Sequence, residues 1–405
     1  MTNRQAAIRI VRRLRKAGYQ ALLAGGCVRD RLLGRRPNDY DVVTDAPPDA
    51  VIRLFRRTLK VGAQFGVVIV LQGSQQVEVA TFRSEAEYTD GRRPDHVTFC
   101  DARHDALRRD FTVNGMFYDP IERRVIDYVG GRDDLQRGIL RTIGPPDERF
   151  GEDYLRMLRA VRFAVQLGFE IEPATWQGIR RHAERITRVS GERIAVELEA
   201  VLTHPDRARG VRLLVESHLA RHIFRDFDGR LARADCGLYE HLPRSVDFAL
   251  ALAALFADVP TEWALERCAV LKPSRRLLQH VQFLLDHREC LLDSEMSLAR
   301  LKMFVASPYY HDLFVLHKAM RKAEARSLAP LRKIRRRAAQ LAGKDITPRP
   351  LLNGHELQAL GVQPGPQVGQ VAQEMYVAQL DEKIHTPDEA RQWVRQWLAR
   401  HAPRD

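Results

Sequence analysis

Residues 24–44 contain the most informative pattern in the chain, Ala-Gly-Gly-Cys-Val-Arg-Asp-Arg-Leu-Leu-Gly-Arg-Arg-Pro-Asn-Asp-Tyr-Asp-Val-Val-Thr. Asp39 and Asp41 lie two positions apart in a run that ends in Val-Val-Thr, which predicts a strand over residues 39–44. Side chains two apart on a strand share one face, so both carboxylates are expected to point the same way. Because two neighbouring anions favour a cation between them, and carboxylate oxygens suit Mg²⁺, the pair predicts a metal site.

Two glycines precede the acidic pair. A strand-like segment over residues 21–24 runs into Gly25 and Gly26, and the helical segment 28–33 that follows carries Arg29. Glycines let a polyanion approach the backbone, and the arginine supplies a charge for it. Gly-Gly and Asp-X-Asp pairs are each common, but together they predict a metal site that faces a phosphate site.

The composition favours a large intracellular protein with a polyanionic partner. The 405 residues carry a formal net charge of +13, and 45% of them are hydrophobic. Such a basic excess favours nucleic acid as the partner class, although most basic residues of any chain are simply solvated. The five cysteines are scattered and form no CxxC pair, which predicts free thiols in a reducing cytosol. No apolar run is long enough for a membrane span, so we expect a cytoplasmic protein without membrane contact.

Three further stretches of the first 142 residues carry candidate groups. Glu78 alternates with valines on a predicted strand over residues 76–82 and is either a third metal-binding carboxylate or a solvated outer residue. The polar segment 84–96 is interpreted as a mobile loop, either a lid or a plain surface connection. A predicted helix over residues 106–116 holds Arg109 and Asp110, which either bind triphosphate and ribose or form a solvated ion pair.

The pattern changes to helix throughout after residue 142. A predicted helix over residues 147–167 places Asp153 and Arg156 three apart, so their side chains are expected to be neighbours. Cytosine and adenine both present an amino donor beside a ring-nitrogen acceptor. One carboxylate and one guanidinium would therefore accept C and A and reject U and G. Arg162 lies half a turn round the helix from Asp153, which also allows it a structural role.

Two stretches of the remaining helices carry side chains of the types that bind metal ions or nucleic acid. His280 and His287 lie seven apart without an adjoining carboxylate cluster, and we interpret them as ordinary helix residues. Residues 332–337, Arg-Lys-Ile-Arg-Arg-Arg, are either a solvated helix face or a contact for an RNA backbone.

At these motifs the chain resembles the class II CCA-adding tRNA nucleotidyltransferases and their bacterial poly(A) polymerase relatives. Gly-Gly-Cys-Val-Arg-Asp with Asp39-Tyr-Asp41 looks like the first motif of that family, and residues 108–114, Arg-Arg-Asp-Phe-Thr-Val-Asn, look like its ribose and triphosphate motif. Residues 152–163 look like its amino-acid template for base selection. The resemblance implies an α+β fold. A nucleotidyltransferase (polymerase beta-like) head with a mixed sheet would occupy residues 1–141, followed by an all-helical neck (142–202), body (203–340) and tail (341–405).

The resemblance also implies a role for each candidate residue. Asp39 and Asp41 would hold two Mg²⁺ ions, with Glu78 as the third catalytic acid. ATP and CTP would be the substrates. The implied nucleotide-binding residues are Gly25, Gly26, Arg29, Arg109, Asp110, Asn114, Asp153, Arg156, Arg159 and Arg162.

Several activities within the family share these motifs. The segment 61–66 lacks the basic pair expected of a poly(A) polymerase, and the 84–96 loop resembles the flexible loop of enzymes that add the terminal A. These features favour template-independent addition of CCA to the 3′ end of tRNA, and the sequence leaves both a monomer and a homodimer open. The alternatives are an enzyme that adds only A or only CC, a poly(A) polymerase, and a non-catalytic RNA-binding protein.

Overall fold

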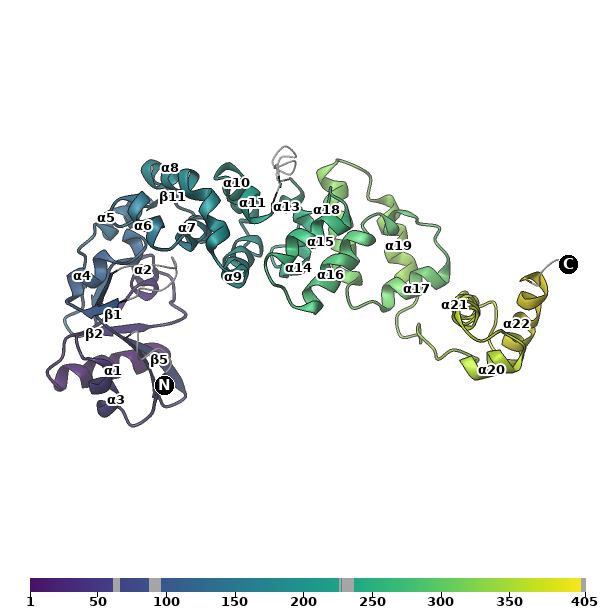
Figure 1. Ribbon diagram of the computed structural model, residues 1–405, viewed down its shortest axis with the longest axis horizontal. Coiled ribbons are helices and arrows are strands. Elements are labelled where there is room, and N and C mark those ends of the chain that lie inside the picture. Colours follow the sequence, from purple (N-terminus) through teal and green to yellow (C-terminus); the bar gives the residue numbers. More distant parts are fainter. Residues whose placement is uncertain (61–65, 87–95, 226, 228–236, 402–405) are drawn as a thin grey trace. The chain divides into compact units, whose positions relative to one another are not determined.

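The computed structural model describes residues 1–60, 66–86, 96–225, 227 and 237–401 (Figure 1). The chain divides into two units. Unit 1 comprises Met1–Cys236 and Glu266–Pro273, and unit 2 comprises Gly237–Leu265 and Ser274–Asp405. This two-part division does not test the predicted head, neck, body and tail boundaries, which stay predictions.

Unit 1 begins with a mixed sheet. Among the described residues its strand order is β3-β4-β5-β2-β1-β8-β9, and only the β2–β5 pair is parallel. The strands are β1 (Ala21–Ala24), β2 (Asp41–Thr44), β3 (Thr58–Leu59), β4 (Val67–Gln72), β5 (Gln75–Thr81), β8 (Phe117–Asp119) and β9 (Arg124–Ile126). The predicted mixed sheet is confirmed.

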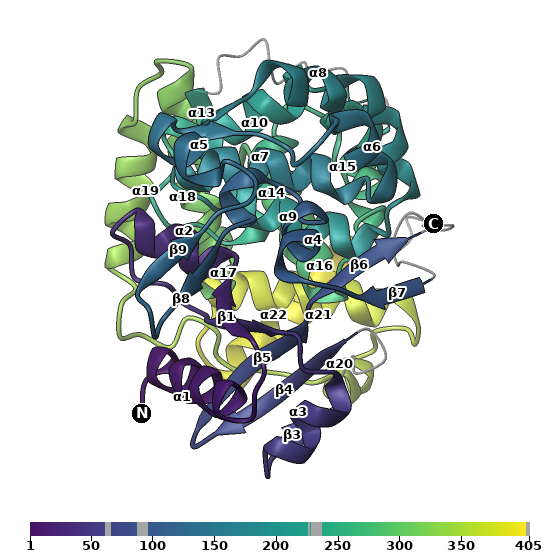
Figure 2. The same cartoon turned by 90° about the vertical axis from the view of Figure 1, so that its left-hand side faces the viewer.

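Helices cover both faces of this sheet. Leu22, Val43 and Phe117 form a buried cluster with Ala102 and Ala106 of the helix α4 (Ala102–Leu107) on one face. The helices α1 (Asn3–Lys16) and α3 (Pro48–Leu54) pack against the other face, as Figures 1 and 2 show. The alternation of side chains along each strand thus sends one set of apolar residues to each layer of helices.

The strand that carries the acidic pair is shorter than predicted. β2 begins at Asp41, which pairs with Ala24 at the end of β1, and Asp39 lies before the strand. Gly25 has a positive φ of 69° and turns the chain from β1 into the helix α2 (Gly26–Leu32). Because β1 ends there, residues 39 and 40 have no neighbour on that side to pair with. The expectation that strand alternation aligns Asp39 with Asp41 is wrong.

Two predicted helices are broken in the structure. The helix expected over residues 106–116 ends at Leu107 with α4, and a 3₁₀ turn, η2 (Thr112–Asn114), follows. Phe111, between them, is fully buried and its backbone bridges to Thr142, so this segment is extended rather than helical. The helix expected over residues 147–167 is two helices, α6 (Pro146–Glu152) and α7 (Leu155–Leu167).

Asp153 separates α6 from α7. Its backbone is extended, with φ −151° and ψ 106°, and its Oδ1 accepts a hydrogen bond of 3.0 Å from the N–H of Leu155. A carboxylate that accepts a backbone N–H at a helix start stabilises that start, and this explains why the chain breaks here. Asp153 therefore precedes α7 rather than lying inside one long helix with Arg156.

Mostly helices complete unit 1. A short parallel pair, β10 (Ile139–Leu140) with β11 (Glu170–Ile171), contradicts the expectation of helix alone beyond residue 142. The other elements of unit 1 are α5 (Gly131–Arg137), α8 (Pro173–His182), η3 (Ala183–Arg188), α9 (Gly191–Leu202), α10 (Arg207–Glu216) and α11 (Leu219–Ile223).

The predicted loop 84–96 is partly strand. β6 (Arg83–Ala86) and β7 (His96–Phe99) pair in antiparallel fashion, so both ends of the segment are ordered by backbone hydrogen bonds. Residues 87–95, which carry the rest of the predicted lid, lie outside the described residues, as do residues 61–65 of the segment compared with poly(A) polymerases.

Unit 2 is helical where the structure describes it. Its helices are α13 (Gly237–Glu240), α14 (Phe248–Leu255), α15 (Thr261–Ala269, whose last residues count in unit 1), α16 (Arg275–Asp286), η4 (Cys290–Leu292), α17 (Leu298–Ala306), α18 (Tyr310–Ala323), α19 (Ala329–Ala339), α20 (Gly354–Ala359), α21 (Pro366–Leu380) and α22 (Pro387–His401). The last three helices share their own core, which includes Met375 and Trp397. The Nζ of Lys302 on α17 donates to the carbonyl of Leu380 at 2.8 Å and ties this core to the preceding helices. None of the described helices is long and apolar enough to span a bilayer.

Gly131 supports the segment that carries Asn114, and its replacement tests that packing. A Cβ at Gly131 would lie 2.2 Å from the carbonyl oxygen of Thr112 and 2.9 Å from Cγ of Met116. We expect Gly131→Ala to lower the free energy of unfolding by about 1–3 kcal/mol, because backbone must move to admit the methyl group. Urea denaturation followed by circular dichroism measures this change.

Gly151→Ala is the matched control. Gly151 lies within α6, and a Cβ there would meet no atom within 4 Å. This variant should be neutral or gain up to about 1 kcal/mol, because alanine favours a helix over glycine. Equal losses in the two variants would contradict the packing argument.

Candidate active site

A cavity of about 500 Å³ in unit 1 gathers most of the predicted site residues. The predicted residues that line it are Gly25, Gly26, Arg29, Asp41, Glu78, Arg109, Asp110, Asn114, Asp153, Arg156 and Arg159. Asp39 and Arg162 are not among its lining residues. The cavity therefore brings together the groups expected to bind metal, phosphate and base, with these two exceptions.

The sheet register places two acids on the cavity side. Val42 pairs with Val79 and Val43 with Ala80 in the parallel β2–β5 pair, so Asp41 and Glu78 occupy the next matching positions and share a face. Asp41 is open to the cavity, yet the surrounding protein displaces enough water to raise its pKa to about 6. The charge of Glu78 and, more weakly, that of Asp39 raise this pKa further, whereas Arg109 opposes the shift.

The donor chemistry of these three acids fits magnesium. Their oxygens are hard donors, and burial followed by the charges of Glu78 and Asp39 raises the pKa of Asp41, a shift that a bound cation would oppose. Asp39 is exposed just outside the strand and acts on Asp41 through its charge. Among the described residues, the three acids do not form a cluster with all ligand atoms within 4.8 Å of one another.

The glycine turn leaves room beside two arginines. A Cβ on Gly25 would approach Nη1 of Arg109 to 3.3 Å, and one on Gly26 would lie 3.6 Å from Nη2 of Arg29. The absence of side chains therefore lets an anion reach the backbone and both guanidinium groups together. Cys27, the next residue, is buried, and its Sγ donates to the carbonyl of Ala24 at 3.2 Å. Burial, together with the charge of Asp41, raises the pKa of this thiol to about 12.

Arg29 and Asp110 belong to one hydrogen-bonded chain. Nη1 of the buried Arg29 donates to Oδ1 of Asn114 at 2.7 Å, and Nδ2 of Asn114 donates to Oδ1 of Asp110 at 3.3 Å. Arg159 of α7 donates from Nη2 and Nε to Oδ2 of Asp110 at 2.6 and 2.9 Å. Burial alone would raise the pKa of Asp110, but the charge and hydrogen bonds of Arg159 lower it below its ordinary value.

Asp105 is a supporting residue that the sequence analysis missed. Its fully buried carboxylate binds Nη2 of Arg108 at 2.7 Å and Nη2 of Arg109 at 3.0 Å. Burial alone would raise its pKa, yet the two arginines lower it. Arg109 thus pairs with Asp105 rather than with the adjacent Asp110. The spacing of Asp105 from the two arginines, three and four residues, is the signal that would have identified it.

The two residues predicted to select the base each have another partner. Oδ2 of Asp153 accepts a hydrogen bond of 2.6 Å from Nη2 of Arg193 on α9. Nη1 of Arg156 pairs with the carboxylate of Glu152 and donates to the carbonyl of Arg149 at 2.9 Å. Both side chains line the cavity without pairing with each other, and Arg193 and Glu152 were missed by the sequence analysis.

Arg162 does not have the nucleotide-binding position that was predicted for it. Its Nε donates to Oε2 of Glu197 at 2.5 Å, and its Nη1 donates to Oε1 of Gln166 at 3.0 Å. The structure does not bring Arg162 into the cavity. A structural role for Arg162 was one of the sequence-based expectations, because a single helix would place it half a turn from Asp153.

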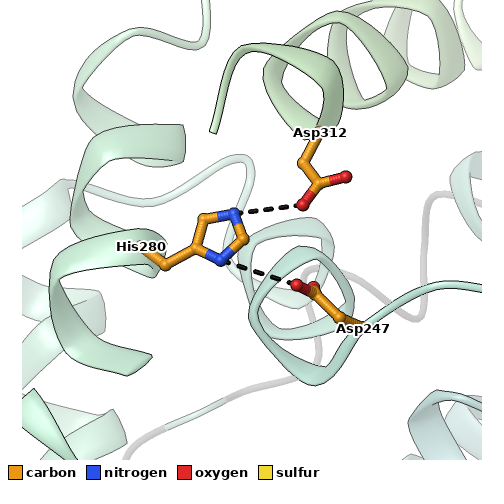
Figure 3. Close-up of side chains that lie close together, drawn as sticks. All are labelled: Asp247, His280 and Asp312. Carbon is orange, nitrogen blue, oxygen red and sulfur yellow. Dashed lines mark ion pairs between the residues drawn. The ribbon is translucent and has the colours of Figure 1, made fainter. Parts of the chain in front are cut away.

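A second group of ligand-type side chains lies in unit 2 (Figure 3). His280 was expected to lack a carboxylate cluster, and that expectation is wrong, because Asp247 and Asp312 approach it from two other helical segments. Nδ1 of His280 lies 3.5 Å from Oδ2 of Asp247, and Nε2 lies 3.2 Å from Oδ2 of Asp312. The two carboxylates thus face different ring nitrogens. A single ion could bond to only one of those nitrogens, so this geometry suits a link between helices better than a metal site.

Comparisons with known proteins agree with this architecture. A family model described as "Poly A polymerase head domain" matches residues 21–141, and one described as "Probable RNA and SrmB- binding site of polymerase A" matches residues 168–231. The crystal structure of the Bacillus stearothermophilus CCA-adding enzyme in complex with CTP is similar, with a TM-score of 0.82 and 29% sequence identity. That similarity covers 99% of this chain and 98% of the other.

Curated proteins show the same relationship. The CCA-adding enzyme of Bacillus pumilus is 44% identical over 214 residues, so the alignment spans about half of that relative, 53% of its length and 53% of this chain. The CCA-adding enzyme of Streptococcus agalactiae is 31% identical over 402 residues, which cover 97% of each protein. Because this similarity extends along nearly the whole chain, the protein belongs to the family of CCA-adding enzymes, which are nucleotidyltransferases.

Proposed function

We propose that this protein is a template-independent, Mg²⁺-dependent nucleotidyltransferase that adds CCA, from CTP and ATP, to the 3′ end of tRNA. The observation that carries the proposal is a single cavity lined by acids, by arginines beside a glycine turn, and by Asp153 and Arg156. Family membership supports it independently. The cytoplasmic location and the monomeric or homodimeric state expected from the sequence stay predictions.

The catalytic acids in this proposal are Asp39, Asp41 and Glu78. Their oxygens would hold Mg²⁺, with Asp39 and Asp41 as the principal ligands. Bound Mg²⁺ supplies two effects in such a site, a lower pKa for the attacking 3′-hydroxyl and charge neutralisation for the pyrophosphate leaving group. The raised pKa of Asp41, which reflects burial and unneutralised acidic neighbours, supports the assignment.

Phosphate and sugar binding would fall to the glycine turn and the arginines beside it. Gly25 and Gly26 leave the backbone open, and the guanidinium groups of Arg29 and Arg109 supply positive charge beside it. Asn114 holds Arg29 and Asp105 holds Arg109, so both guanidinium groups are oriented before a nucleotide arrives. Such preorganisation reduces the entropy that the side chains lose on binding.

Base selection would depend on Asp153 and Arg156. An oxygen of Asp153 would accept a hydrogen bond from the amino group of cytosine or adenine, and Arg156 would donate to the adjacent ring nitrogen. Uracil and guanine would leave these charged groups unpaired, which is strongly unfavourable. The hydrogen bonds from Arg193 and from the N–H of Leu155 fix the orientation of the Asp153 carboxylate.

A substrate panel tests the proposed activity. The purified chain with Mg²⁺ is given tRNA that ends before CCA, tRNA that ends in CC, and an unstructured RNA, each with CTP and ATP. Addition of CCA followed by arrest is the expected result. Extension of only the CC-ended tRNA would mean an A-adding enzyme, addition that stops after CC would mean a CC-adding enzyme, and long A tails on any RNA would mean a poly(A) polymerase. If no substrate is extended, the result favours the alternative of a non-catalytic RNA-binding protein.

Replacement of the catalytic acids tests the metal site. We expect Asp41→Asn and Asp39→Asn each to lower kcat by about 100-fold or more, because each removes a carboxylate that would hold the metal. Asp49→Asn is the matched control, since Asp49 is an exposed acid on α3 outside the cavity. Full activity in Asp41→Asn, measured by incorporation of labelled CMP, would rule out this site.

Replacement of Asp153 tests base selection. Asp153→Ala should lower the preference for CTP over UTP, measured as the ratio of kcat/KM, by about 100-fold while metal-dependent transfer persists. Arg193→Gln should lower the same ratio by less, because Asp153 stays but loses the partner that orients it. A thermal melt of each variant controls for damage to the start of α7. An unchanged ratio in a folded Asp153→Ala protein would contradict the pairing scheme.

A further inference from the structure

A second cavity in unit 1 has no role in the site described above. It has a volume of about 860 Å³, and its walls come from the start of α1, the end of α2 and the segment between Gly34 and Tyr40. Among the residues that the structure describes, four arginines line it, Arg4, Arg31, Arg35 and Arg36, and no acidic residue does. The cavity is therefore a concave surface with positive charge alone.

None of these four arginines pairs with a carboxylate in the part of the chain that the structure describes. Arg31 donates to the hydroxyl of Tyr118 at 3.2 Å and stacks on its ring, and Arg35 donates to the carbonyl of Gln166 at 3.2 Å. Arg4 and Arg36 are exposed, and their side chains have no hydrogen bond or ion pair among the described residues. Their charges are free to bind an anion.

A smaller cavity in unit 1 provides a comparison, because its arginines are paired with acids. That cavity, of about 360 Å³, is lined by Arg15 and Arg124 together with Asp119 and Glu122. Arg15 pairs there with Asp119, and Nε of Arg124 binds Oε2 of Glu122 at 2.6 Å. The two arginines of this smaller cavity are thus paired with acids, whereas those of the larger cavity are not paired among the described residues.

The segment between Gly34 and Tyr40, which forms one wall of the basic cavity, is held in place and leads along the chain to the catalytic acids. Nδ2 of Asn3 donates to the carbonyl of Asn38 at 3.2 Å, which holds the segment against the start of α1. Tyr40 lines the basic cavity, and the next residue, Asp41, lines the catalytic one. Arg36 and Asp39 are three positions apart, so their Cα atoms lie within about 11 Å of each other and the basic cavity adjoins a catalytic acid along the chain.

We propose that this basic cavity binds phosphodiester groups of the RNA strand whose 3′ end is extended. The inference rests on the proposed function, because that function requires an RNA end beside Asp39 and Asp41. Arginine is suited to phosphate through paired N–H donors, and a polyanionic strand supplies several phosphates to a cavity with four such groups. The start of α1, with no acidic residue in its first turn, adds the positive end of a helix dipole.

The test compares the salt dependence of RNA binding in three versions of the full chain. Arg4→Gln/Arg36→Gln removes two unpaired charges from the cavity. Arg53→Gln/Arg56→Gln removes two exposed charges outside it, at the end of α3 and just after it, and is the matched control. Binding of tRNA that lacks CCA is measured by fluorescence anisotropy over a range of KCl concentrations, without nucleotide.

We expect the cavity variant to bind this tRNA about tenfold more weakly, and the slope of log K against log [KCl] to become shallower by about one to two. The control variant should keep the wild-type slope. In extension assays, the cavity variant should raise KM for tRNA and keep KM for CTP within about twofold of wild type. A wild-type slope in the cavity variant, or an equal change in the control, would overturn the proposal.

Inorganic pyrophosphate separates RNA from a free phosphate ligand. If calorimetry shows that the cavity variant loses pyrophosphate binding while its tRNA slope stays wild-type, the cavity takes a free phosphate compound and the RNA assignment is wrong. Because binding is measured without nucleotide, this test is independent of catalysis. A wild-type protein that extends no tRNA but shows the expected slope difference would refute the proposed function and leave the cavity assignment standing.

Discussion

The buried carboxylate of Asp110 is the interaction on which the arrangement of the candidate site depends. It accepts hydrogen bonds from Arg159 on α7 and from Asn114 in η2, and Asn114 in turn holds Arg29 on α2. Three separate segments therefore meet at one charged group. A buried carboxylate is stable only when its hydrogen-bonding capacity is satisfied, so movement of any of these segments would carry a large energetic cost. The parts of the cavity that come from α7 and from α2 are held together by this requirement.

Charge is distributed unevenly along the cavity. Seven arginines and four acids are among its lining residues, and two of the acids, Asp110 and Asp153, are paired with Arg159 and Arg193. Asp41 and Glu78 share one face of the sheet, where burial and, after it, the charge of Glu78 raise the pKa of Asp41. The two acids without an arginine partner among the described residues suit a cation, and the arginines of the same cavity suit an anion. A magnesium–triphosphate complex has this same pairing of charges.

The residue types and their approximate neighbours were predictable from the sequence, because the Gly-Gly turn, the acidic strand and the change to helix near residue 142 are local patterns. The mixed sheet was expected from the family resemblance that these motifs carry, not from the patterns themselves. The failures came from partners distant in the chain. The extended backbone of Phe111 depends on Thr142, and the break at Asp153 is accompanied by a bond to Arg193, forty residues on. The start of β2 depends on where β1 ends. Helical periodicity contains none of this information, so the helices over residues 106–116 and 147–167 were predicted too long.

Cys27 gives the glycine turn a chemical property of its own. The thiolate is the form of cysteine that reacts with peroxide or alkylating reagents, and burial beside Asp41 holds the pKa of this thiol near 12. At neutral pH the sulfur therefore stays protonated and inert, although it follows directly after the two glycines of the cavity. The glycine turn thus carries a small, buried sulfur-containing side chain in the form that is less reactive toward peroxide and alkylating reagents.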